Sequence, residues 1–212
     1  MKKVLLIAAV AVFGLTSVQA QDISFGAKAG VNLANLGGDV EDNDMKIGFH
    51  VGGVVEIPLS EQFSFAPELL FSTQGTKSEY SETDTFLGET FTYEFEEKLN
   101  LSYLNIPLMA KYYVSEGFSL EAGPQVGFLI SAKAEGDESV TVDGVTESES
   151  YSIDIKDELE SLDFGLNFGA GFKMESGLFF QGRYNLGLAN LTGNSDVKIT
   201  NQVIQFSVGF MF

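Results

Sequence analysis

The sequence predicts an all-β fold: an eight-stranded antiparallel up-and-down transmembrane β-barrel. Apolar residues alternate with polar or small residues in eight separate stretches, which is the pattern of strands with two different faces. The connections between these stretches alternate between short and long, as in barrels with tight turns at one end and longer loops at the other. Beyond the N-terminus, no stretch reaches the roughly 18 consecutive apolar residues of a transmembrane helix.

The first 20 residues have the pattern of a Sec-type signal peptide. Two lysines precede an apolar or small-residue run over residues 4–15, and small residues at positions 18 and 20 form the cleavage pattern. A membrane anchor is the alternative, but the run of 12 residues is shorter than the ~20 that a spanning helix needs. We therefore expect cleavage after Ala20, with residues 1–20 removed and residues 21–212 forming one outer-membrane β-barrel domain.

Eight strands and seven connections follow from the alternation. The expected strands are residues 23–33, 47–57, 63–72, 104–112, 118–130, 164–173, 178–188 and 201–212. The short connections are residues 58–62, 115–117 and 175–177, and the long ones are residues 37–46, 74–98, 133–159 and 190–197. An even number of strands places both ends of the barrel domain on the side of the short turns, which is the periplasmic side of outer-membrane barrels.

The chain is strongly acidic, with a formal net charge of −18. Without Lys2 and Lys3, 10 basic residues remain against 30 acidic ones, a charge of −20, so attraction to nucleic acid or an anionic membrane surface is excluded. The first three long connections hold 20 of the 30 acidic residues. We interpret them as solvated, self-repelling loops; a divalent-cation site is the alternative, although no segment has the ligand spacing of a calcium loop.

The size of the side chains indicates which strand face meets lipid. The apolar faces carry many Phe, Leu, Ile and Tyr residues, whereas the opposite faces are rich in Gly, Ser, Asn and Gln. The interior of an eight-stranded barrel is only just wide enough to be filled by side chains, so large aromatic residues from every strand would not fit there. We therefore expect the aromatic faces to point outward into lipid and the polar faces to point into the barrel.

Charged residues on the polar faces predict ion pairs inside the barrel. A single charge in this interior would be costly, so opposite charges are expected to meet. We expect a lumenal ion-pair network formed by Glu68, Lys111, Glu121 and Arg183. The single histidine, His50, falls in the middle of a strand on the same inner face, where a catalytic triad is not expected. No catalytic residue, metal site or cofactor is predicted, and the absence of cysteine rules out disulfides and thiolate metal sites.

The last strand ends in an exposed pattern of aromatic residues and finishes on Phe212. Closure of this strand against the first one would leave no open sheet edge, and its aromatic face would meet lipid. A terminal Phe on an alternating strand resembles the C-terminal signal that the outer-membrane assembly machinery of Gram-negative bacteria reads. We therefore expect Phe212 to be an assembly signal, and the barrel-assembly machinery and outer-membrane lipid to be partners.

Several stretches carry a resemblance to a known family. These are FGAKAGVNLANL (25–36), YLNIPLMAKYY (103–113), GPQVGFLIS (123–131), DFGLNFGAGF (163–172) and GRYNLGLANL (182–191). In their order, and with the terminal Phe, they resemble the PorT-like outer-membrane β-barrel family, which has the eight-stranded architecture of the outer-membrane protein A barrel. The resemblance implies an integral outer-membrane location without implying one activity, although PorT-like members have been linked to protein secretion.

Three classes of function remain open at this point. The first is a nonenzymatic outer-membrane barrel that is structural or meets an extracellular partner through its acidic loops, of which the second and third are the best candidates. The second is a small porin, which the filled interior of an eight-stranded barrel disfavours. The third is a soluble lipocalin-like periplasmic binder, which the aromatic faces and Phe212 disfavour. An outer-membrane enzyme is a distant fourth, because no plausible catalytic set is present.

Overall fold

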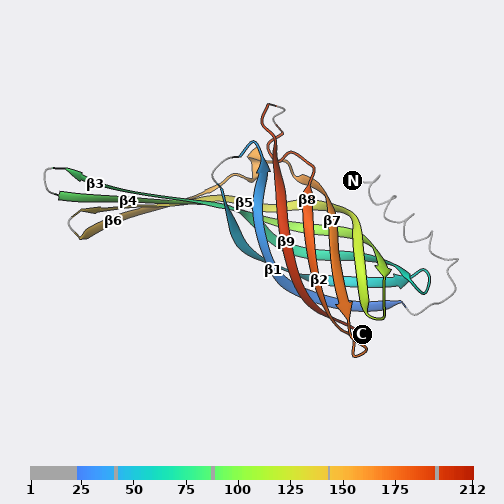
Figure 1. Ribbon diagram of the computed structural model, residues 1–212. Coiled ribbons are helices and arrows are strands. Elements are labelled where there is room, and N and C mark those ends of the chain that lie inside the picture. The colour runs from blue at the N-terminus through green and yellow to red at the C-terminus, as the bar shows by residue number, and fades with distance from the viewer. Residues whose placement is uncertain (1–22, 41–42, 87–88, 143, 194–195) are drawn as a thin grey trace.

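The computed structural model describes residues 23–212, apart from 41–42, 87–88, 143 and 194–195 (Figure 1). The expected signal peptide, residues 1–20, lies outside the described residues. The strands are β1 (Ser24–Gly38), β2 (Asp44–Pro58), β3 (Phe63–Phe86), β4 (Glu89–Tyr113), β5 (Phe118–Val142), β6 (Val145–Asp154), β7 (Leu162–Lys173), β8 (Leu178–Gly187) and β9 (Ile199–Met211). A 3-10 turn, η1 (Lys156–Glu158), follows β6. Among the described residues, no helix is long and apolar enough to cross a membrane.

Eight of the nine strands close into a barrel. The ring runs β1-β2-β3-β4-β5-β7-β8-β9 and closes by antiparallel pairing of β9 with β1, from Gly26↔Met211 to Gly38↔Ile199. The amide of Phe212 extends this ladder by donating a 2.8 Å hydrogen bond to the carbonyl of Phe25. The predicted eight-stranded antiparallel barrel, closed by its last strand, is therefore confirmed, and closure removes the open edges of the wall.

The second and third long connections are not loops, contrary to the sequence-based prediction. Strands β3, β4 and β5 continue past the barrel mouth and are joined there by β6, which pairs with β5 from Lys133↔Asp154 to Val142↔Val145. We call this four-stranded sheet the extension; it consists of residues 77–86 of β3, 89–98 of β4, 135–142 of β5 and all of β6. Figure 1 shows it projecting from the end of the barrel opposite the short turns.

The loop prediction was wrong because it relied on the many acidic residues of these segments. The same segments also carry strand-forming residues. Val, Thr, Tyr and Phe recur through residues 90–95 and 140–146, and these types favour strands. Asp143-Gly144 stands between two such runs, and Asp-Gly is a strong signal for a two-residue hairpin turn. Gly144 has a φ of +83°, as such a turn requires of its second central residue.

Two backbone irregularities lie where the extension leaves the barrel. The β4–β5 register shifts between Ser102 and Tyr103, because Ser102 pairs with Ser131 whereas Tyr103 pairs with Leu129. The extra residue on β5 is a bulge, which bends a strand and increases its twist. At nearly the same level, Gly75 of β3 has a φ of +126°, in a region that side chains other than glycine rarely adopt. Together these features allow the strands of the extension to change direction where they leave the barrel wall.

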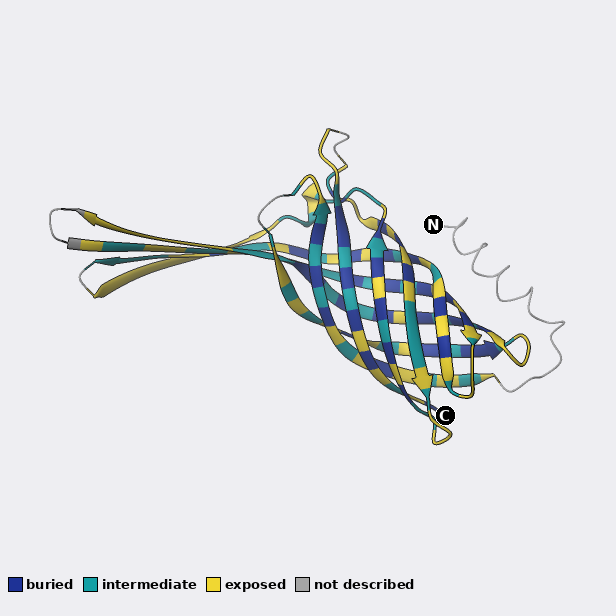
Figure 2. Cartoon of the chain, in the orientation of Figure 1, coloured by how far each residue is buried: buried dark blue, intermediate teal, exposed yellow. Residues whose placement is uncertain are grey.

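Buried and exposed residues alternate along the strands of the barrel wall (Figure 2), and the exposed residues are mainly apolar and the buried ones mainly polar, as the residue sizes predicted. The exposed outward residues include Phe25, Phe49, Leu69, Leu120, Phe128, Phe164, Phe168, Phe172, Phe180, Phe206 and Phe210. The buried inward residues include Lys28, Asn32, His50, Ser72, Asn105, Gln125, Asn167, Arg183, Asn185, Gln205 and Ser207. A water-soluble barrel would have the reverse arrangement, so this wall fits a lipid surround.

Two apolar clusters lie inside the barrel, one near each end. Near the extension, Tyr103 and Leu101 pack with Leu36, Leu129 and Leu191. The second cluster lies near the short turns and consists of Val54, Ala66, Met109, Phe179 and Met211. Many polar side chains of the interior lie between these two apolar clusters, and a further polar group around Glu56 and Lys111 lies between the second cluster and the short turns.

Candidate functional site: a sealed interior and an acidic extension

The middle of the barrel holds a closed ring of hydrogen bonds and ion pairs. Arg183 on β8 donates two hydrogen bonds to the carboxylate of Glu68 on β3, at 2.8 and 2.9 Å. Its Nη2 also lies 3.5 Å from Oε2 of Glu121 on β5. Gln181 donates from Nε2 to Glu121 at 2.8 Å and accepts from Lys28 at Oε1 at 2.7 Å. Lys28 on β1 completes the ring with a 2.7 Å contact to Glu68.

This central ring joins four strands that are distant in the sequence. Lys28, Glu68, Glu121, Gln181 and Arg183 come from β1, β3, β5 and β8 and are all less than a tenth exposed. Two positive and two negative side chains make the ring formally neutral. A neutral, mutually bonded group avoids the large cost of one unpaired charge in a dry interior. The central ring therefore fills the middle of the barrel and connects opposite parts of its wall.

Of the four residues predicted to form one network, three meet and the fourth lies elsewhere. Glu68, Glu121 and Arg183 are in the central ring, but the ion pair of Lys111 is with Glu56, at 3.4 Å. Glu56 also lies 3.6 Å from Lys173 and accepts a short hydrogen bond from the hydroxyl of Tyr113. This second group sits nearer the short turns, one layer away from the central ring.

Lys28, Gln181 and Glu56 were not assigned partners from the sequence. The alternation placed Lys28 and Glu56 on the inner face, which is correct. However, strand tilt and stagger decide which inward residues lie at one level of a barrel, and neither can be read from one sequence. Lys111 illustrates this: its backbone is level with Glu121 on the neighbouring strand, yet its ammonium reaches Glu56.

His50 lies in a buried chain of hydrogen bonds. Its Nδ1 is 2.7 Å from Oδ1 of Asn32, and its Nε2 is 2.7 Å from Oγ of Ser207. Because the amide oxygen can only accept, Nδ1 carries the proton, and Nε2 of the neutral ring accepts from the Ser207 hydroxyl. This order resembles the serine, base and orienting residue of a hydrolase. All three residues are at most 7% exposed, so a substrate could not reach them while the barrel is closed.

No cluster of His, Cys, Asp or Glu with the arrangement of a metal site occurs among the described residues. The carboxylates of Glu56, Glu68 and Glu121 are bonded to lysine, arginine, glutamine or tyrosine side chains, and that of Asp163 accepts a 2.9 Å hydrogen bond from Asn201. These bonds connect strands on different sides of the barrel wall. The surface left for recognition is on the extension.

The extension carries most of the exposed charge. It contains 13 acidic residues against two lysines. Its side chains are largely exposed, whereas those of the barrel wall alternate between buried and exposed (Figure 2). A hollow of about 600 Å³ crosses its middle and is lined by three successive rows of paired residues from all four strands, which begin on β3 at Glu79, Tyr80 and Ser81. The sequence predicted a binding surface on residues 74–98 and 133–159. The hollow lies within these segments, which form strands rather than the expected loops.

Comparison with models of known protein families gives one match. The sequence profile of the family described as "Outer membrane protein beta-barrel domain" matches residues 19–193, most of the chain. The chain belongs to this family. Its barrel is thus an outer-membrane barrel, as predicted, and a soluble lipocalin-like binder is the wrong alternative. The narrower resemblance to the PorT-like family stays a prediction.

Three solved structures are similar to this chain over most of its length. The attachment invasion locus protein of Yersinia pestis is 11% identical, over 91% of this chain and all of its own, with a TM-score of 0.47. Neisserial surface protein A is 12% identical, over 91% of this chain and all of its own, with a TM-score of 0.40. CarO of Acinetobacter baumannii is 12% identical, over 87% of this chain and 97% of its own, with a TM-score of 0.38. No curated protein matches the sequence.

Proposed function

We propose that the protein is a nonenzymatic outer-membrane barrel that holds the extension outside the cell as a binding surface. The observation that carries this proposal is the difference in accessibility between the two parts. The polar side chains of the barrel are buried and bonded to one another, whereas most carboxylates of the extension and its tyrosines Tyr80, Tyr93 and Tyr151 are exposed. Because outer-membrane barrels have short periplasmic turns, the extension would lie on the extracellular side.

A shortened chain tests this proposal. Residues 78–97 and 136–151 are each replaced by Asn-Gly, because Lys77 pairs with Lys98 and Glu135 pairs with Ser152, so a two-residue turn can close each hairpin. We expect the shortened barrel to reach the outer membrane and to keep a gel mobility that changes on heating, as a closed barrel should. We also expect cells that carry it to lose the capture of extracellular polypeptides that the full chain supports. Equal capture by both chains would contradict the proposal.

The small-porin alternative is disfavoured by the filled interior. The central ring, the two apolar clusters and the group around Glu56 occupy successive levels of the barrel. An eight-stranded barrel filled in this way has no continuous water path. We expect the purified protein in planar bilayers to show no steady conductance, and regular single-channel steps would favour the porin instead. A role in secretion rests on the PorT-like resemblance alone.

Phe212 is proposed to act during assembly rather than in the finished barrel. Its side chain is 82% exposed and lies 5.5 Å from the ring of Phe210, outside the interior. A Phe212→Ser variant should therefore refold in detergent as the unchanged chain does, while its amount in the outer membrane falls several-fold. Comparison of refolding yield with outer-membrane level separates the two effects. A normal outer-membrane level would contradict an assembly role.

A further inference from the structure

The two faces of the extension differ in charge and in apolar content. Residues that pair across the four strands lie in rows, and successive rows point to opposite faces. One face continues the inner surface of the barrel, because its rows lead down to the buried Leu101 and Ala132. We call it the acidic-aromatic face. The other, which continues the outer surface of the barrel, contains Lys77 and Lys98, and we call it the lysine face.

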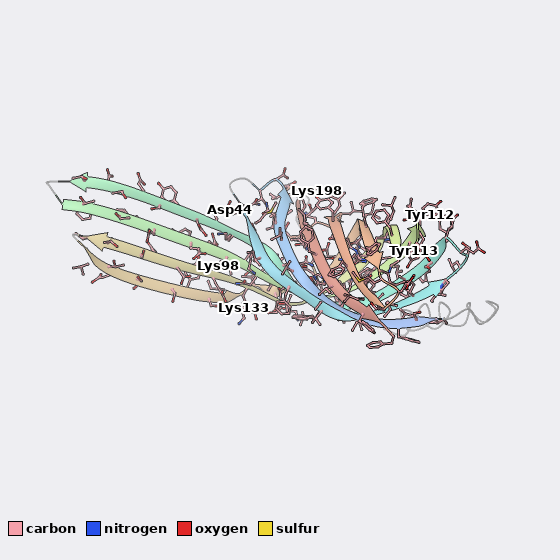
Figure 3. All side chains as sticks on the ribbon, turned by 60° about the horizontal axis from the view of Figure 1, so that its bottom comes forward. Asp44, Lys98, Tyr112, Tyr113, Lys133 and Lys198 are labelled. Carbon is pink, nitrogen blue, oxygen red and sulfur yellow. The ribbon has the colours of Figure 1, made fainter. Side chains whose placement is uncertain are left out.

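The charges of the lysine face partly neutralise one another. Lys98 lies 2.9 Å from Glu96 and 3.9 Å from Asp137, and Lys77 forms an ion pair with Glu79. The hydrogen bond to Glu96 raises the pKa of Lys98, and the hydrogen bond from Lys77 lowers the pKa of Glu79. Lys98 lies on the sheet near its junction with the barrel (Figure 3). The two lysines of this face therefore pair with carboxylates of the same face.

The acidic-aromatic face has no cation of its own among the described residues. Both lysines of the extension are on the opposite face. Its carboxylates, all exposed, are Glu82, Asp84, Glu97, Glu138, Glu147 and Glu149. Its apolar and aromatic side chains include Tyr80, Phe91, Tyr93, Phe95, Val140, Val142, Val145, Tyr151 and Ile153. Tyr93 is 45% exposed and Val145 is 69% exposed, whereas Phe91, Phe95, Val140 and Val142 are half-buried, so the apolar side chains of this face are partly open to solvent.

The apolar and acidic residues of this face are separated in space. Phe91, Tyr93 and Phe95 on β4 and Val140 and Val142 on β5 form a strip along the two central strands. The acidic side chains border this strip on both sides. On β3 they are Glu82 and Asp84, and on β6 they are Glu147 and Glu149, whereas Glu138 on β5 and Glu97 on β4 lie at the barrel end of the strip. A partner that matches this pattern has an apolar stripe with basic residues along both of its flanks.

We propose that the acidic-aromatic face binds a cationic amphipathic helix; this inference rests on the proposed function of the extension as a binding surface. The face spans about 14 Å across four strands and about 20 Å along them. A helix is about 10–12 Å wide with its side chains, and about 13 residues cover 20 Å. Laid along β4 and β5, it would bury the apolar strip, and its flanking lysines or arginines would meet the carboxylates and aromatic rings. A second copy of the chain is excluded, because two such faces would repel each other.

The test measures binding of a synthetic peptide to the full chain in nanodiscs of uncharged phosphatidylcholine, with empty discs as the blank. The probe is an amidated Leu-Lys peptide of about 14 residues, with leucines at helical spacing. A triple variant of the acidic-aromatic face carries Glu82→Gln, Glu147→Gln and Glu149→Gln. Its matched control on the lysine face carries Glu79→Gln, Glu94→Gln and Glu96→Gln, which removes the same formal charge.

We expect the triple variant of the acidic-aromatic face to raise the Kd about tenfold, as three exposed ion pairs would allow, and its control to stay within about twofold. A Tyr93→Thr, Val140→Thr double variant, which keeps strand-forming residues, should also weaken binding while leaving its salt dependence intact. Equal losses in the two triple variants would overturn the proposal, because bulk charge would then explain binding.

Two further comparisons distinguish the possible failures. A peptide of the same composition with leucines at every second position favours a strand, and its tighter binding would overturn a helical occupant. The shortened barrel should bind no more peptide than empty discs. If it binds as well as the full chain, the proposed function of the extension fails as well. If it loses binding while the two triple variants remain equal, only the assignment to this face fails.

Discussion

The barrel and the extension share three strands, β3, β4 and β5, yet their charged side chains are in opposite environments. In the barrel, Lys28, Glu68 and Arg183 are buried and bonded to one another. In the extension, Glu82 and Glu147 are exposed, and no cation lies on their face among the described residues. Alternation with a period of two therefore carries different meanings along one strand. In the barrel, the polar positions of these strands hold charges that neutralise one another. In the extension, the polar positions of the acidic-aromatic face hold carboxylates without a neighbouring cation in the part of the chain that the structure describes.

This difference predicts that the same chemical change has unequal effects in the two parts. A buried ion pair that loses one partner leaves an uncompensated charge, which costs several kcal/mol. An exposed ion pair contributes little, because water and salt screen it. Substitutions that are matched between the barrel and the extension measure the contrast directly.

The largest effect is expected for Glu68→Gln. This change removes the carboxylate that lies between Lys28 and Arg183, so the free energy of unfolding should fall by about 3 kcal/mol or more. Urea unfolding of the barrel in detergent micelles measures this loss. Glu61→Gln, at an exposed position between β2 and β3, is the matched control and should have no measurable effect.

A double variant checks that lost neutrality is the cause. Lys28→Met combined with Glu68→Gln leaves Arg183 with Glu121, one charge of each sign. The double variant should therefore be more stable than Glu68→Gln alone. If Glu68→Gln unfolds at the same urea concentration as the unchanged chain, the central ring contributes no stability.

An intermediate effect is expected for Tyr103→Phe. The Tyr103 hydroxyl is buried in the barrel and accepts a 3.2 Å hydrogen bond from Asn201, so its removal should cost about 1 kcal/mol. Tyr80→Phe removes the hydrogen bond that the Tyr80 hydroxyl donates to Glu82 on the exposed extension, and it should leave unfolding of the barrel unchanged. Equal losses in the two variants would contradict the contrast between the buried and the exposed part.

The smallest effect is expected for Glu96→Gln. It breaks the exposed pair with Lys98, so stability should change by less than about 0.5 kcal/mol, and less still at high salt. The pKa of Lys98 should fall towards its ordinary value, because the hydrogen bond that raises it is lost. Titration of the lysine side chain by NMR measures this shift, and an unchanged pKa would mean that the pair is absent in solution.

The barrel could be predicted from the sequence because lipid and a narrow interior constrain its residues strongly. Runs such as Phe164 to Phe172 alternate large and small side chains, which only one orientation of the wall accommodates. The extension is exposed on both faces, so that constraint is absent. Acidic residues such as Glu94 and Glu96 were read as signs of a loop, whereas Thr92, Tyr93 and the Asp-Gly turn at 143–144 favoured strands.

The interior was predictable by face but not by partner. Alternation placed Glu68, Lys111, Glu121 and Arg183 on the inner side, and all four are buried. It could not show that Lys28 and Gln181 complete a ring with three of them while Lys111 lies with Glu56. The relative heights of inward residues depend on strand tilt, which is a property of the closed barrel as a whole.

The continuity of β3, β4 and β5 through the mouth of the barrel has a mechanical consequence. The extension is joined to the wall by unbroken ladders of hydrogen bonds rather than by a flexible tether, and its ten or so residues per strand reach about 30 Å outward. Gly75 and the bulge beside Ser102 fix the direction in which it leaves. A force applied at the tip of the extension is thus transmitted along hydrogen-bonded strands to the barrel wall, which is anchored in lipid. The extension should therefore hold its position relative to the barrel.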